Sequence, residues 1–171
     1  MTEKSNRYYG KYRGTVLLNI DPKLLGRITA QVPDVLGPIP CSWATPCVPI
    51  AGLQSGIFVV PGIGSGVWIE FEQGDLDHPI WTGGWWANPA EVPVLANFPS
   101  PTPTPNIVLQ TTLNTVMLSD NTSPAGGIML RSGAASIIVN STGIYILNGS
   151  GASIVMQGAS VVVNLGALTV L

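Results

Sequence analysis

Charge is nearly absent from the second half of this chain. The sequence of 171 residues has 7 Lys and Arg and 9 Asp and Glu, and of these only Asp120 and Arg131 lie within residues 92–171. The same segment is rich in short β-branched runs, at residues 137–139, 144–147, 154–156 and 161–163. A monomer of this size cannot bury both faces of so many apolar strands. We therefore expect this segment to associate with copies of itself.

Long apolar runs and helical patterns are also scarce. Gly, Ser, Asn and Thr interrupt every run before it reaches the roughly 18 residues of a membrane helix. With 20 Gly and 15 Pro, the chain shows no sustained i, i+3, i+4 apolar spacing, and we predict an all-β protein. The polar start lacks an apolar signal segment, so we expect synthesis in the cytoplasm. A formal net charge of -2 gives no support for a nucleic-acid partner.

The chain has only two cysteines and one histidine, which is too few for most catalytic and metal-binding sites. Cys41 and Cys47 could form a pair, although free buried thiols are favoured for a cytosolic chain. His78 is the single histidine, and the sequence has no Gly-x-Ser-x-Gly elbow, so a Ser–His–acid triad is not expected. We predict no catalytic residues and no cofactor.

The chain divides into three predicted parts. Residues 1–86 are expected to form a small barrel, because turn residues separate strand-like runs at 12–20, 26–32, 57–60 and 67–71. Residues 87–106 are a Pro-rich linker, expected to be extended and stiff, with polyproline II at 100–105. Residues 107–171 are the third part.

Glycines recur in this third part at 133, 143, 149, 158 and 166. A spacing of about eight residues predicts one short strand and one tight turn per repeat, stacked on its neighbours. Steps this short favour an intertwined β-helix of several chains, three being natural for a triangular cross-section. The predicted trimer core contains Ile138, Ile146, Val155 and Val162. Strand alternation places Val162 opposite to Val161 and Val163.

Three motifs have a functional and a structural interpretation. The carboxylates Glu70, Glu72, Asp75 and Asp77 beside His78 could serve metal or acid–base chemistry. We favour a solvated surface, with Glu70 and Glu72 opposite Trp68, Ile69 and Phe71, and His78 in a surface turn. The glycines at 62, 64 and 66 lead into a strand and not a helix, so a β-turn is favoured over a phosphate loop. The aromatics Trp81, Trp85 and Trp86 could stack bases or sugars, but packing is favoured because few basic residues surround them.

One ordered set of motifs resembles a known family. It runs Gly14-x-Val16-x-x-Asn19-x-Asp21-Pro22, Gly26-Arg27-Ile28-x-x-x-Val32-Pro33, Trp43-Ala44-x-Pro46, Pro61-x-x-Gly64-x-Gly66-Val67-Trp68-Ile69-Glu70-Phe71-Glu72-x-Gly74-Asp75 and Pro79-x-Trp81-x-Gly83. Residues 10–86 thereby resemble the OB-fold domain of the central spike of contractile injection systems. This family includes phage baseplate assembly protein V and VgrG-like proteins. The glycine-periodic segment is similar to the trimeric β-helix that follows this domain in the family.

The resemblance implies a homotrimeric spike with an OB-fold collar and a β-helical needle. Its implied partners are the baseplate hub and inner-tube proteins and a PAAR-like cap, with only transient contact to the target envelope. Lys11 and Lys23 are expected on the hub-facing side of the collar, because the collar carries nearly all the charge. The cap would dock on the apolar end, Leu168, Thr169, Val170 and Leu171. Assembly is expected in a phage tail baseplate or a related contractile particle, and the sequence leaves open which of these systems it serves.

Two departures from the family pattern limit the resemblance. The lysozyme domain that some phage spikes carry between barrel and helix is replaced here by the Pro-rich linker. The His-x-His motif that binds iron at some spike tips is absent, since no histidine follows His78, and we predict no metal. Two rival functions remain: a trimeric β-helical enzyme acting on polysaccharide, and an OB-fold module that binds oligonucleotides or sugars.

Overall fold

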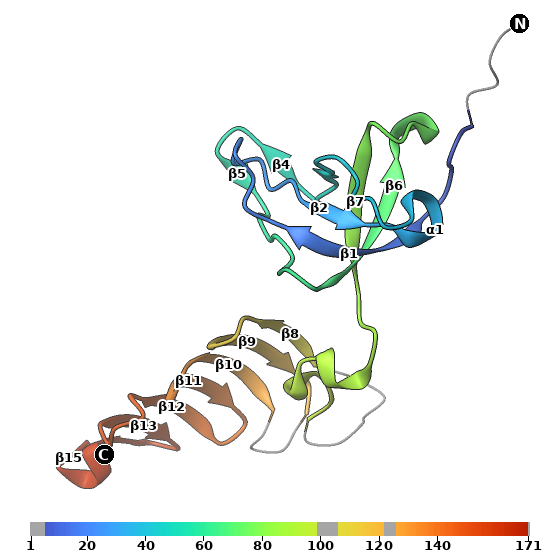
Figure 1. Cartoon of the computed structure of the whole chain (residues 1–171). Helices are drawn as coiled ribbons and strands as arrows, with labels where there is room; N and C mark the ends of the chain where they lie inside the picture. Colours follow the sequence, from blue (N-terminus) through green and yellow to red (C-terminus); the bar gives the residue numbers. More distant parts are fainter. Residues whose placement is uncertain (1–5, 99–105, 122–125, 171) are drawn as a thin grey trace, which may run out of the picture. The chain divides into compact units, whose positions relative to one another are not determined.

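The computed structural model describes residues 6–98, 106–121 and 126–170. The chain divides into two compact units, Met1–Pro89 and Ala90–Leu171, coloured from blue to green and from green to red in Figure 1. Both units are built from strands, and the prediction of an all-β protein is confirmed.

The N-terminal unit is a partly closed barrel. Its described residues form β1 (Tyr12–Leu18), β2 (Thr29–Gln31), α1 (Pro33–Leu36), β3 (Thr45–Pro46), β4 (Ala51–Gly52), β5 (Ser55–Gly56), β6 (Gly66–Phe71), η1 (Glu72–Gly74) and β7 (Pro79–Trp85). Five of these strands form one sheet in the order β2-β1-β6-β7-β3, and β4 pairs with β5 in a hairpin. Isolated bridges join Ile28 to Ala44 and Gln31 to Pro40, which brings the two edges of the sheet together.

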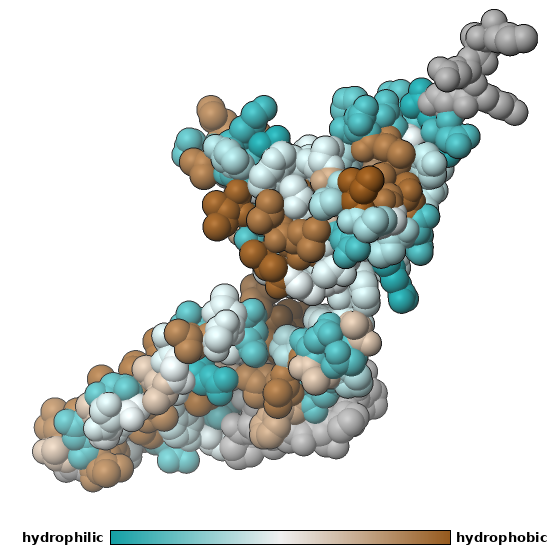
Figure 2. Space-filling model, in the orientation of Figure 1, coloured by the Kyte–Doolittle hydropathy of each residue, from teal (hydrophilic) through white to brown (hydrophobic). Residues whose placement is uncertain are grey.

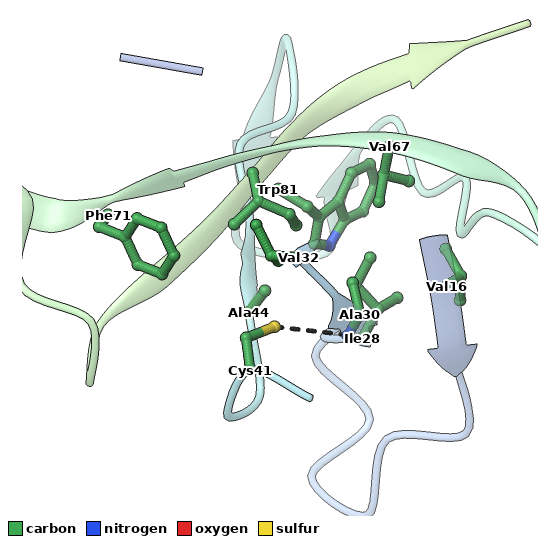
Figure 3. Packing of buried hydrophobic residues seen from close by; sticks show 10 residues of the cluster. Val16, Ile28, Ala30, Val32, Cys41, Ala44, Val67, Phe71 and Trp81 are labelled. Carbon is green, nitrogen blue, oxygen red and sulfur yellow. Dashed lines mark hydrogen bonds between the residues drawn. The ribbon is translucent and has the colours of Figure 1, made fainter. Parts of the chain in front are cut away.

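The core of the barrel follows from strand alternation. On β6 every second side chain, Val67, Ile69 and Phe71, is buried. They pack with Trp81 from β7 and with smaller residues from the other elements: Val16, Ile28, Ala30, Val32, Cys41 and Ala44 (Figure 3). The sulfur of the Cys41 thiol accepts a hydrogen bond from the backbone N–H of Ala30, with the nitrogen 3.4 Å from Sγ.

Three details differ from the sequence-based expectations. Residues 57–60 are not a strand: the chain forms the β4–β5 hairpin just before them and then continues as coil, exposed at 57–59 and half-buried at Val60. The strand expected at 26–32 is limited to β2. Trp68 lies on the same side of β6 as Glu70 and not opposite to it, since only Val67, Ile69 and Phe71 face the core.

The C-terminal unit begins with two short turns and continues as one sheet. Its described residues form η2 (Pro89–Glu91), η3 (Val94–Asn97), β8 (Ile107–Gln110), β9 (Asn114–Ser119), β10 (Gly127–Ser132), β11 (Ala135–Asn140), β12 (Gly143–Leu147), β13 (Ser153–Gln157), β14 (Ser160–Val163), η4 (Asn164–Gly166) and β15 (Leu168–Val170). These eight strands pair in sequence order, each antiparallel to the next (Figure 1). The single chain therefore forms a meander, as the strand-and-turn repeat predicted, while the intertwining of chains stays a prediction.

The linker differs from its predicted extended form. Residues 89–91 and 94–97 form 3₁₀ turns. The Asn106 side chain holds the second turn, because its Nδ2 donates to the carbonyls of Leu95 at 2.7 Å and Phe98 at 2.8 Å. The segment predicted as polyproline II, 100–105, lies outside the described residues.

Candidate interaction surfaces

The meander has two faces of different chemistry. Cross-strand register links Leu130, Ile137, Ile146, Ile154 and Val163 in one continuous row. A second row on the same face links Leu118, Ile128, Val139, Ile144, Met156 and Val161. We call these two rows, with Val116 and Leu168 at the ends of the first, the aliphatic face. Most of these side chains are exposed in the single chain, at 43% for Ile137 and 37% for Ile146.

The opposite side, which we call the mixed face, alternates apolar and polar residues. Register places Met117, Met129, Ile138, Tyr145, Val155 and Val162 in its central row. Thr115, Arg131 and Ser136 lie beside this row. The Tyr145 hydroxyl is 2.7 Å from the Thr142 hydroxyl, which in turn donates to Asn140 Oδ1 at 2.8 Å. This face therefore carries hydrogen-bonding groups that water can satisfy.

The chain packs its own Asn106 side chain against part of the mixed face. Met117 is only 3% exposed, and Asn106 Nδ2, which holds the η3 turn, lies 3.7 Å from Met117 Sδ. Thr115, on the same side of β9, is also buried. The end of the mixed face nearest η3 is thus already packed within one chain.

The predicted trimer core does not form a single surface. Ile138, Val155 and Val162 lie on the mixed face, whereas Ile146 pairs with Ile137 and Ile154 on the aliphatic face. The four residues therefore do not share one face of the sheet, and which face lies toward a trimer axis stays a prediction. The predicted opposition of Val162 to Val161 and Val163 is confirmed by the register of β13 and β14.

The predicted tip is described only in part. Leu168 is exposed and begins β15, the last strand of the sheet. Leu171 and the side chains of Thr169 and Val170 lie outside the described residues.

The two predicted hub-facing lysines have different surroundings. Lys11 Nζ contacts Glu70 Oε1 at 2.6 Å and Thr82 Oγ1 at 2.9 Å on the exposed barrel surface. Lys23 lies in the exposed loop that joins β1 to β2. The two lysines thus lie in different parts of the barrel surface, and their contact with a hub protein stays a prediction.

A buried ion pair shapes the loop of Lys23. The Asp21 side chain is 2% exposed, and its Oδ1 lies 2.6 Å from Arg27 Nη2. Asp21 also accepts backbone N–H donations from Lys23, Leu25 and Arg27. Arg27 holds the pKa of Asp21 well below its usual range, because it donates hydrogen bonds to the carboxylate. Sequence reasoning named both residues only as part of a motif and missed their pairing.

The barrel also presents an apolar surface next to this loop, which we call the collar patch: Leu25, Ile50, Phe58 and Val59. These exposed residues surround a cavity of about 400 Å³. A Cβ added to Gly26 would lie 3.0 Å from Phe58 Cε2, so the Phe58 ring rests closely on this glycine. Figure 2 shows hydrophobic surface on the side of the unit that carries β4 and β5.

The acidic residues are engaged in surface ion pairs. Asp75 Oδ2 lies 3.9 Å from Arg7 Nη1 and 3.7 Å from His78 Nδ1, and Glu70 pairs with Lys11. His78 is exposed in the turn before β7, as predicted. Within the described residues, no three His, Cys, Asp or Glu side chains are grouped closely enough to hold a metal ion.

The tryptophans and cysteines take distinct positions. Trp81 is buried in the core of the barrel, where its Nε1 donates to the Gly26 carbonyl at 3.1 Å. The Trp85 indole N–H donates to the Val67 carbonyl, and the Arg13 guanidinium carbon lies 4.9 Å from the centre of the Trp85 ring, whereas Trp86 is exposed.

Both cysteines are free; Cys41 is buried, as expected, but Cys47 is exposed. Burial raises the pKa of the Cys41 thiol.

The chain thus contains a partly closed barrel and, after it in the sequence, a strand-and-turn meander. Residues 12–86 match the model of the type VI secretion system and phage-baseplate injector OB domain. Residues 106–169 match the model of the phage baseplate V C-terminal trimerisation domain. Together the two matches cover most of the chain, and the chain belongs to the phage baseplate V family. No curated protein matches it.

These matches confirm the resemblance and the OB fold, and they identify the meander as a trimerisation domain. The family assembles in phage tails and type VI secretion machines, so the chain is a component of such a particle. Across residues 6–98, 106–121 and 126–170, no helix has the length and apolar character needed to cross a membrane.

Proposed function

We propose that this chain is the central spike of a contractile tail or injection machine, joining the baseplate hub and inner tube to the membrane-piercing tip. The observation that carries the proposal is the order of its two domains, an injector OB domain followed by a trimerisation domain. Three copies would form a collar at the hub and an intertwined β-helical needle beyond it. The chain would be made in the bacterial cytoplasm and assembled there into the particle.

The proposed role is mechanical and not enzymatic. Contraction of a sheath would drive the trimer through the envelope, which requires a rod that does not bend. A continuous ladder of antiparallel strands supplies stiffness along the stacking direction, since each strand is hydrogen-bonded to its neighbours. Two carboxylates of the collar are paired with cations, Asp21 with Arg27 and Glu70 with Lys11, which favours a structural role for these two.

The location of the chain in purified particles tests this proposal. A tagged chain should appear as three copies on the axis of the particle, at the end of the tube that leads into the target. Particles lacking the chain should fail to deliver their contents. Copies located at the periphery of the baseplate would contradict the proposal.

The collar is the proposed binding site for the hub. Lys23 and Lys11 could supply polar contacts, and the collar patch beside the Lys23 loop offers an exposed apolar area with a cavity.

Cross-links from Lys11 or Lys23 to a hub protein are expected in assembled particles. In addition, Phe58→Ser should weaken the co-purification of the hub protein with this chain. Ile39→Ser is the matched control, because Ile39 is exposed but does not line the cavity. Hub cross-links confined to residues beyond 107 would reverse this assignment.

A PAAR-like cap is the proposed partner at the far end. β15 ends the sheet, and its exposed Leu168 would be repeated three times around the axis of a trimer. An exposed apolar side chain on the outermost strand of the sheet favours a covering protein. Imaging of intact particles should show density beyond Leu171, together with a small cap protein in their proteome. Density that tapers to an apex formed by this chain itself would remove the cap.

A further inference from the structure

We propose that the aliphatic face, and not the mixed face, lines the axis of the trimer, where it packs against the same face of two further copies. This inference rests on the trimer of the proposed function and assigns the surface that forms it. The two rows of the aliphatic face run from β9 to β14 without a polar residue. Most of their side chains are exposed in the single chain, so they need a partner.

The direction of these rows fits a symmetry axis. Cross-strand partners such as Ile137, Ile146 and Ile154 follow one another from strand to strand, along the direction in which the meander grows. If the trimer axis runs parallel to this direction, nearly every strand of the meander contributes two aliphatic side chains that face the axis. Three copies would bring six such rows together and form a continuous apolar core.

The mixed face is unsuited to the same position. Arg131 lies on it, and three copies would bring three like charges to one axis. The hydrogen-bonded Tyr145, Thr142 and Asn140 also lie on or beside this face and would lose access to water. Moreover, Met117 is already covered within its own chain near the η3 turn, which leaves less of this face for another copy.

Two adjacent isoleucines on β11 allow a matched test in the full-length chain. Ile137 lies on the aliphatic face and Ile138 on the mixed face. Ile137→Asp should abolish the trimer, with the molar mass from light scattering falling to that of one chain. Ile138→Asp should leave the trimer intact. The opposite pattern, or equal loss in both variants, overturns the proposal.

Two cysteine variants, Ile137→Cys and Ile138→Cys, test the same face assignment if an Asp variant fails to fold. In a Cys47→Ser background, which removes the exposed thiol, Ile138→Cys should react with a maleimide under native conditions and Ile137→Cys should be protected. Mild oxidation should give disulfide-linked dimers only with Ile137→Cys, because the three thiols would lie near one axis. Labelling of Ile137→Cys with protection of Ile138→Cys overturns the face assignment alone. A wild-type chain that is a monomer overturns the proposed spike and this inference together.

Discussion

Arg27 and Asp21 form a shielded, multiply bonded ion pair at the base of the loop between β1 and β2. Arg27 Nε lies 3.1 Å from both carboxylate oxygens of Asp21, in addition to the short Nη2 contact. The Arg27 guanidinium also lies 5.4 Å from the centre of the Trp43 ring. This arrangement fixes a loop in which Leu24 adopts a left-handed backbone with φ of 55°. The pair therefore orders the loop next to the collar patch.

Replacing Asp21 with Asn should lower the stability of the collar at neutral pH, because Arg27 and three backbone N–H groups lose a carboxylate acceptor. The pKa of Asp21 is lowered in the folded state from its usual value of 3.8. The stabilisation is thus fully present above the unfolded pKa near 4 and is lost as the pH falls toward the folded pKa. Urea unfolding at pH 7, 5 and 3 should show a steeper acid loss for wild type than for Asp21→Asn. Asp34→Asn, at an exposed position, is the control, and an unchanged pH slope in Asp21→Asn would contradict the role of the pair.

Ile69→Ala should destabilise the barrel by about 2–5 kcal/mol, because removal of a fully buried side chain leaves a cavity in the barrel core. All 5 tryptophans lie within residues 1–89, so tryptophan fluorescence during unfolding reports on this unit alone. Ile20→Ala, at 84% exposure, is the control and should change the stability by less than about 0.5 kcal/mol. Equal effects of the two substitutions would show that the core is placed wrongly.

Two glycines of the meander should respond differently to alanine. A Cβ at Gly143 would collide with the Met156 carbonyl of the neighbouring strand, so Gly143→Ala should disrupt the pairing of β12 with β13. Gly133 has φ of 56° and open space around it, so Gly133→Ala should cost only about 1 kcal/mol for the left-handed backbone. Thermal unfolding followed by circular dichroism checks both variants. A larger loss for Gly133→Ala would contradict the turn and strand positions described here.

A chain ending at Pro89 should fold as a soluble collar that no longer forms stable trimers. The division into two compact units supports this, since the barrel core draws all its residues from the first unit. Tryptophan fluorescence should match that of the intact chain, whereas light scattering should give the mass of a monomer. A stable trimer of this fragment would show that the collar itself holds the copies together.

Much of the architecture could be predicted from local pattern. Local pattern placed Ile69 and Phe71 on the buried side of β6, although it was wrong for Trp68, and the recurring glycines predicted the strand-and-turn repeat. Alternation along one strand does not supply the register between strands, which places the four predicted core residues on two faces of the sheet. Ile138 and Ile146 are equally apolar, and their spacing along the chain does not say on which side of the sheet each lies after the intervening turn.

By itself, then, the sequence determined that the chain is all-β and that it has a charged barrel and a charge-poor repeat. Those features follow from composition, turn residues and short-range periodicity, which are properties of neighbouring residues, while its ordered motifs carried the resemblance to the family. Only the tertiary structure decided which strands pair and in which register, and thereby which side chains form the aliphatic face. It also decided that Asp21 meets Arg27 in a shielded pair and that Phe58 rests on Gly26. Such relations depend on how turns redirect the backbone, because a shift of one residue in register moves every side chain of a strand to the opposite face.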